Sequence, residues 1–183
     1  MIARKRYQFA RSSGITNARI GSQSNEQTDI NGFAAEMAFC KLHNLYPDFS
    51  VHYVSARNGT DTGDCRLPDG RTVDVKTTTY KSGKLLVAGW KQRTVAMYAL
   101  MIGSIDAGFR YCGVIASSAV LTPLFRQSFN GRTSYVATQS QLTNIERYDK
   151  GTEADPRIKV SNHKAQGTDS RHETKTNRYM GDR

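Results

Sequence analysis

The chain has 183 residues, and its 26 lysines and arginines outnumber its 16 aspartates and glutamates, which gives a formal net charge of +10. No apolar run approaches the ~18 residues that span a bilayer, and the basic N-terminus lacks the apolar segment of a secretory signal. The positive charge favours a polyanionic partner, nucleic acid before an anionic membrane surface. A basic protein without such a partner remains an alternative.

The chain has three cysteines, an odd number, which lie far apart in the sequence and form no C-x-x-C motif. This spacing argues against a disulfide framework and, together with the lack of paired histidines, against a zinc site. Cys40, Cys65 and Cys112 are therefore expected to be reduced thiols in a cytoplasmic compartment.

Residues 1–28 are polar and carry no acidic residue before Glu26, which is typical of a flexible basic arm. From Asp29 to about Asn44 the apolar residues recur at helical spacing, with Asp29 as a plausible N-cap and Pro47 just beyond the end. The predicted apolar stripe of this helix consists of Ile30, Phe33, Ala34, Met37, Ala38 and Cys40.

Further along the chain the pattern changes to short strands separated by turns. The interval 95–102 fits a buried strand or a helix, and the glycine that follows it favours a strand. Trp90 is expected in the core, and base stacking is its alternative role. Strands are predicted over 51–56, 72–80, 85–90, 95–102, 109–116 and 134–137, and short helices over 117–125 and 139–148.

These elements predict a mixed α/β (α+β) domain over residues 29–148, with a sheet of about five strands flanked by helices. From residue 149 to 183 the chain is polar and almost free of large aliphatic side chains. Such a composition is typical of a disordered tail.

The sequence Pro68-Asp69-Gly70 has the chemistry of a tight turn: proline fixes φ, aspartate bonds its own backbone and glycine accepts a positive φ. With these residues as the loop, Leu67 faces Arg71, and counting outward sets Asp64 opposite Asp74. Lys76 lies two residues beyond Asp74 and so shares its face, whereas Val73 and Val75 point into a core.

Two facing carboxylates repel each other, and a divalent cation between them would turn that repulsion into coordination. A third acid, Glu36, lies at the edge of the apolar stripe, where it can reach the end of the sheet. For Glu36 the alternative is an ordinary solvated side chain, and for Lys76 it is a simple salt bridge to one aspartate.

Together, Glu36, Asp64, Asp74 and Lys76 resemble the PD-(D/E)XK nuclease superfamily, the restriction-endonuclease-like phosphodiesterases. Residues 32–38 resemble the first helix of that family with its acid. Gly63-Asp64 stands where the family has Pro-Asp, and Asp74-Val75-Lys76 stands for its (D/E)-x-K. The resemblance spans residues 29 to about 117 and implies a restriction-endonuclease-like αβββαβ core.

The resemblance implies Mg²⁺-dependent hydrolysis of phosphodiester bonds in nucleic acid, with DNA favoured over RNA and Mn²⁺ as a substitute ion. Asp64, Asp74 and the carbonyl of Val75 would hold the metal, and Glu36 would bind it through water or hold a second ion. Lys76 would orient the attacking water and offset charge on the phosphate.

Phosphate contacts without sequence reading are predicted from basic residues of the arm and of the chain after the hairpin. They are Arg4, Lys5, Arg6, Lys81, Lys84, Lys91 and Arg93.

Two other interpretations stay open. The first is a non-catalytic basic protein that binds nucleic acid, in which the acids are incidental or vestigial. The second is a structural protein whose hairpin acids bind Ca²⁺ for stability. Neither needs Glu36, Asp64, Asp74 and Lys76 at one place, and the nuclease needs all four.

Overall fold

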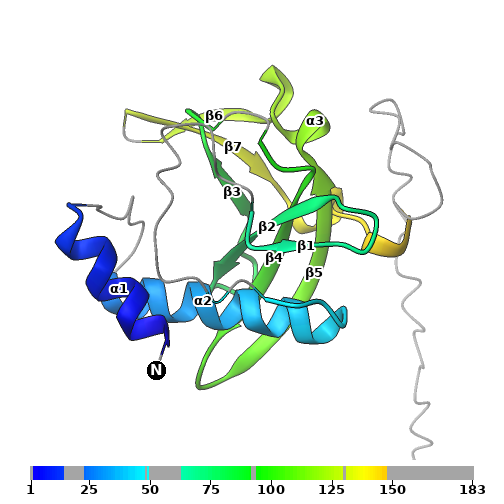
Figure 1. Cartoon of the computed structure of the whole chain (residues 1–183). Helices are drawn as coiled ribbons and strands as arrows, with labels where there is room; N and C mark the ends of the chain where they lie inside the picture. The colour runs from blue at the N-terminus through cyan, green and yellow to red at the C-terminus, as the bar shows by residue number, and fades with distance from the viewer. Residues whose placement is uncertain are drawn as a thin grey trace, which may run out of the picture.

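The computed structural model describes residues 2–14, 23–47, 49, 63–91, 94–129 and 131–147 (Figure 1). They form a mixed α/β fold in which two N-terminal helices pack on a four-stranded sheet, next to a small three-stranded antiparallel sheet. The elements are α1 (Ile2–Ser12), α2 (Asn25–Leu42), β1 (Cys65–Arg66), β2 (Thr72–Thr78), β3 (Leu85–Ala88), β4 (Met97–Ser104), β5 (Gly108–Ala116), α3 (Ser117–Val120), η2 (Pro123–Phe125), β6 (Arg126–Phe129), β7 (Arg132–Ala137), η3 (Gln139–Gln141) and η4 (Ile145–Arg147).

The four-stranded sheet has the order β1-β2-β4-β5, in which β2 and β4 are parallel and the other pairs are antiparallel. The central strand β4 is buried from Met97 to Ile102, because side chains cover both of its faces. The strand alternative for 95–102 and its pairing with 109–116 are thus confirmed. One face packs on α2, and the other packs against β3, α3 and β7 (Figure 1).

The small sheet has the order β3-β7-β6, so the predicted single sheet of about five strands is in fact two sheets. β6 escaped prediction because its sequence, Arg-Gln-Ser-Phe, lacks the apolar alternation of a half-buried strand. The predicted helix over 139–148 is replaced by the two short helices η3 and η4. The predicted strand over 51–56 and the predicted tail over 149–183 lie outside the described residues.

Helix α2 begins earlier than predicted, because Ser24 rather than Asp29 is its N-cap and accepts a hydrogen bond from the Gln27 amide at 3.1 Å. Its buried residues are Asn31, Ala35, Phe39 and Cys40, so the predicted stripe was mostly out of phase. The reason is that α2 has two contact surfaces: the sheet covers one, and α1 lies along another.

Residues 2–12 correct the prediction of a flexible arm over 1–28, because they form helix α1 and dock on α2. Ala3 and Ala10 are buried in this contact. Three ion pairs join the helices: Arg4–Glu26 at 3.2 Å, Arg6–Glu36 at 2.9 Å and Arg11–Asp29 at 3.2 Å.

The three cysteines form no disulfide, as predicted. In the described part of the chain no helix combines the length and the apolar character needed to cross a membrane.

Candidate metal and phosphate site

The β1–β2 hairpin has the predicted loop. Gly70 has a φ of +88° and donates its N–H to the Leu67 carbonyl at 2.9 Å, while Leu67 donates to the Arg71 carbonyl at 2.8 Å. Asp69 accepts the Arg71 amide at 2.9 Å, which is the aspartate self-bonding expected of this turn. These bonds fix the hairpin register.

That register carries Asp64 to the edge of β2. Cys65 pairs with Val73, and the Asp64 amide donates to the carbonyl of that same Val73 at 2.8 Å. The regular register therefore ends at Cys65, with a bulge-like irregularity at Asp64, and the predicted pairing of Asp64 with Asp74 is not among the register pairs of this hairpin. The Asp64 carboxylate accepts the Val75 amide at 2.6 Å, in the place that a longer β1 would occupy. Since Val73 and Val75 direct their backbone groups to the same side, the Val75 carbonyl faces this edge too.

Gly63 stands where the pattern of the PD-(D/E)XK resemblance has proline, and its backbone conformation explains the difference. Its φ is +79°, which the ring of proline forbids. A Cβ atom at Gly63 would lie only 2.8 Å from the Val73 carbonyl oxygen. Only glycine fits this approach, and it sets the direction in which Asp64 enters the strand.

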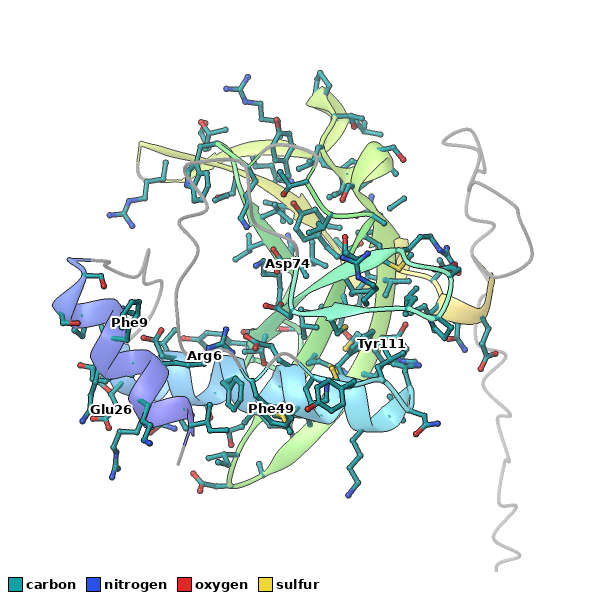
Figure 2. The ribbon with its side chains drawn as sticks, viewed as in Figure 1. Arg6, Phe9, Glu26, Phe49, Asp74 and Tyr111 are labelled. Atoms are coloured by element: carbon teal, nitrogen blue, oxygen red, sulfur yellow. The ribbon has the colours of Figure 1, made fainter. Side chains whose placement is uncertain are left out.

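Asp74 is a buried carboxylate held by two lysines. It is 3% exposed and lies within the sheet region labelled in Figure 2. Its oxygens contact the ammonium groups of Lys76 and, at 3.3 Å, Lys91. Burial by itself lowers the pKa of Lys76, but the charges of Asp74 and Asp64 outweigh that effect and raise it above its usual value. Lys76 is therefore a permanent cation in this site.

Glu36 reaches the same site from α2. Its carboxylate accepts a hydrogen bond from Arg6 of α1 at 2.9 Å, and its side chain is only 16% exposed; Figure 2 shows Arg6 where the two helices meet. Burial raises the pKa of Glu36 and Asp74 adds to the rise, while Arg6 and Lys76 oppose it. Glu36 thus lies within electrostatic range of the β2 residues.

Burial also raises the pKa of Asp64, well above its usual range, and the negative charges of Glu36 and Asp74 add to the rise. Lys76 and the Val75 amide oppose this change without cancelling it. The structure thus brings Glu36, Asp64, Asp74 and Lys76 together, and the three acids repel one another there.

The donors at this place are carboxylate oxygens and one carbonyl, which is the hard-oxygen set that Mg²⁺ takes. Within the described residues, however, no group of three acidic, histidine or cysteine side chains is arranged ready to hold a metal ion. Two of the three acids are instead paired with cations of the protein: Arg6 contacts Glu36, and Lys76 and Lys91 contact Asp74. The donor set fits the ion in its chemistry, and binding requires these cations to give way.

A family model matches residues 1–154, which include both sheets and both long helices, and it describes a family of unknown function (DUF5843). The chain belongs to this family. A search of curated proteins finds no match. In this DUF5843 member the candidate site is therefore argued from its own geometry.

The basic residues predicted to contact nucleic acid fall into two groups in the DUF5843 chain. Arg4, Lys5, Lys81 and Lys84 are exposed, and Arg4 also pairs with Glu26. Arg6 and Lys91 instead bind carboxylates of the candidate site. Arg93 lies outside the described residues.

Sequence reasoning missed the place of Arg6 and Lys91 in the site and predicted the wrong environment for Trp90, which is 62% exposed rather than in the core. Arg6 meets Glu36 thirty positions away, and Lys91 meets Asp74 seventeen positions away. No local spacing signals such contacts. The turn that ends β3 just before Trp90 is the one local feature that could have indicated exposure.

Proposed function

We propose that this DUF5843 member is a Mg²⁺-dependent nuclease with a restriction-endonuclease-like core, and that its substrate is nucleic acid, DNA rather than RNA. One observation carries the proposal: three carboxylates, Glu36, Asp64 and Asp74, gather near Lys76, where burial, with a further contribution from the neighbouring acids, raises the pKa of Glu36 and of Asp64. Such clusters of perturbed groups are typical of functional sites.

The order of the acids along the chain supports the finer fold assignment. An acid on α2 is followed by an acid at the start of the β1–β2 hairpin and by Asp-x-Lys on β2, and β2 then pairs in parallel with β4. The order of the acids is the one that the (D/E)-x-K resemblance implies, whereas the elements run α2-β1-β2-β3-β4-β5-α3 and so differ from the αβββαβ succession. The small sheet β3-β7-β6 would be an addition to that core.

In the proposed site Asp64, Asp74 and the Val75 carbonyl hold the ion, and Glu36 holds it through water or holds a second ion. Bound there, Mg²⁺ supplies positive charge for the phosphate and acidifies water near neutral pH. Lys76, kept protonated by its neighbours, orients the attacking water and stabilises negative charge on the phosphate. Lys91, which lies 3.3 Å from an Asp74 oxygen, would be placed to pair with a phosphate oxygen at the same site.

A second candidate is a nucleic-acid-binding protein without catalysis. The observation that favours it is that protein cations neutralise Glu36 and Asp74. On this interpretation the acids only organise the basic side chains around them, and no metal is needed.

A cleavage assay separates the two candidates. Supercoiled DNA, linear duplex, single-stranded DNA and RNA are incubated with Mg²⁺, Mn²⁺, Ca²⁺ or EDTA. We expect cleavage only with Mg²⁺ or Mn²⁺, and a loss of at least about 100-fold in rate for Asp74→Asn and for Lys76→Ala.

Asp69→Asn is the matched control, because Asp69 is an acid of the same hairpin that lies in the turn and keeps its oxygen acceptor as asparagine. It should cleave at the wild-type rate. Binding of every substrate without cleavage in any metal would reject the nuclease in favour of the second candidate.

A further inference from the structure

Trp90 is a large aromatic side chain in an unusual place. Tryptophan is mostly buried in folded proteins, because its ring gains much from leaving water. Trp90 is nevertheless 62% exposed, and it is the only tryptophan in the chain. An exposed indole next to a charged site is suited to contact a ligand.

The turn that carries Trp90 is firmly held. Lys91 donates its backbone N–H to the Ala88 carbonyl at 3.0 Å, and Gly89 donates to the Thr133 carbonyl of β7 at 2.9 Å. A Cβ at Gly89 would lie 2.6 Å from that same carbonyl oxygen, so the turn is also pressed close against β7. The indole is therefore presented from a fixed backbone, which lowers the entropy lost on binding.

The neighbour of Trp90 ties it to the candidate site. The ammonium of Lys91 lies 5.7 Å from the centre of the indole ring and 3.3 Å from an Asp74 oxygen. One lysine thus links the aromatic face to the carboxylate that is proposed to hold the metal. A nucleotide whose phosphate pairs with the ammonium of Lys91 has its base within reach of Trp90.

We propose that Trp90 is a stacking site for an unpaired nucleobase next to the phosphate that is cut, so that the preferred substrate is single-stranded or locally unpaired nucleic acid. This inference rests on the proposed function and names its substrate class. A base inside a duplex has its faces covered by its neighbours, whereas an unpaired base offers a face to an aromatic ring. The net charge of +10 and Lys91 favour a polyanion over an apolar partner.

Because the chain has one tryptophan, its fluorescence reports Trp90 alone. The full chain is titrated in EDTA, where cleavage does not occur, with a single-stranded oligonucleotide, with the duplex of the same length, and with vesicles of phosphatidylserine and phosphatidylcholine. We expect strong quenching by the single strand and weaker quenching by the duplex. The variants that lack Trp90 are followed by the fluorescence anisotropy of a dye-labelled oligonucleotide: Trp90→Ala should weaken single-strand affinity by about 5- to 150-fold, and Trp90→Phe should keep most of it.

Tyr80→Ala is the matched control, because Tyr80 is an aromatic residue of nearly equal exposure, 61%, and the variant keeps the fluorescent reporter. It should bind and quench as wild type does. Equal affinity of Trp90→Ala and wild type, or equal quenching by strand and duplex, overturns the inference even if Mg²⁺-dependent cleavage is observed. Quenching or a blue shift with vesicles alone overturns it in favour of a membrane surface. Selective single-strand quenching without cleavage in Mg²⁺ supports the stacking site and rejects the nuclease.

Discussion

Asp64 shows at the scale of one residue how the hairpin holds a carboxylate in an unfavourable place. Its side chain is bonded to the Val75 amide, which keeps it at the edge of β2, while burial and two neighbouring acids oppose its ionisation. A folded chain that retains such a charge without metal loses stability for it. The position is therefore expected to favour site chemistry over stability, which mutation can test.

Asp64→Asn should stabilise the metal-free protein, and only above acidic pH. The raised pKa means that the folded state keeps its proton to higher pH than the unfolded state does. The Asp64 carboxyl therefore does not lower the free energy of unfolding below about pH 4, where it is protonated in both states. As the pH rises through its folded-state pKa it destabilises the fold, by about 1.4 kcal/mol for each unit by which the folded-state pKa exceeds the unfolded-state pKa. Asparagine can still accept the Val75 amide. Urea unfolding of both proteins in EDTA between pH 4 and 8 measures the difference.

The difference in free energy of unfolding between Asp64→Asn and the wild type should therefore increase with pH. The control Asp69→Asn should behave in the opposite sense, because hydrogen bonding from the Arg71 amide lowers the pKa of Asp69, so its benefit is present at neutral pH and is lost in acid. A pH-independent gap for Asp64→Asn would show that this carboxylate is not perturbed.

Gly63→Ala should destabilise the protein more than Gly70→Ala. Both positions have a positive φ, which costs an alanine roughly 1–2 kcal/mol. At Gly63 the new Cβ would also meet the Val73 carbonyl, whereas at Gly70 nothing lies within 4 Å. Chemical denaturation of the two variants measures the difference, and equal losses would mean that the close approach at Gly63 relaxes without cost.

Among the elements, α1 is the one whose contacts the sequence predicted least. Its arginines pair with three acids of α2, and one of them, Arg6, takes the carboxylate that the proposed metal site would use. Its guanidinium also lies 4.8 Å from the centre of the Phe33 ring, a favourable cation–aromatic contact. In the proposed site, docked α1 would therefore compete with a metal ion for Glu36.

Arg6→Ala should lower the Mn²⁺ or Mg²⁺ concentration needed for half-maximal cleavage several-fold, because the competing cation is gone. It should also lower stability at neutral pH in EDTA, since Glu36 loses its main counter-charge. Arg4→Ala is the control: it removes another α1–α2 ion pair, which is exposed and does not involve Glu36. A higher metal requirement for Arg6→Ala would contradict competition.

The elements that sequence predicted well are those whose signals are local. The hairpin is an example, because the turn chemistry of residues 68–70 and the alternation of β2 lie within a dozen positions. The docking of α1, the phase of α2 and the division into two sheets depend on contacts between distant segments, such as Asn31 accepting the Ile105 amide. Propensity and periodicity carry no information on these contacts, so Arg6 and Lys91 could not be placed in the site.

For the whole molecule, the net charge of +10 predicts salt-dependent binding of nucleic acid. Lys81→Ala and Lys84→Ala, which remove exposed charges, should each reduce the slope of log affinity against log salt by about one. Lys41→Ala, an exposed lysine at the end of α2, should leave the slope unchanged. Filter binding to a short DNA from low to moderate salt measures these slopes. Equal changes in slope for the three lysine variants would indicate that the net charge of the protein, and no defined binding surface, attracts the DNA.

The shortness of β1 has a consequence beyond chemistry. On β2 it pairs with Thr72 and Val73, Cys65 also bridges to Pro47 on its other side, and in the described part of the chain the rest of that border of β2 meets no further strand. Open borders of this kind invite intermolecular strand addition and fibril growth, and natural sheets guard them with inward-pointing charges. The Asp64 carboxylate, bonded to the Val75 amide, occupies such a guarding position. A variant of this chain that lost the Asp64 carboxylate would therefore need another gatekeeper at this border to stay monodisperse.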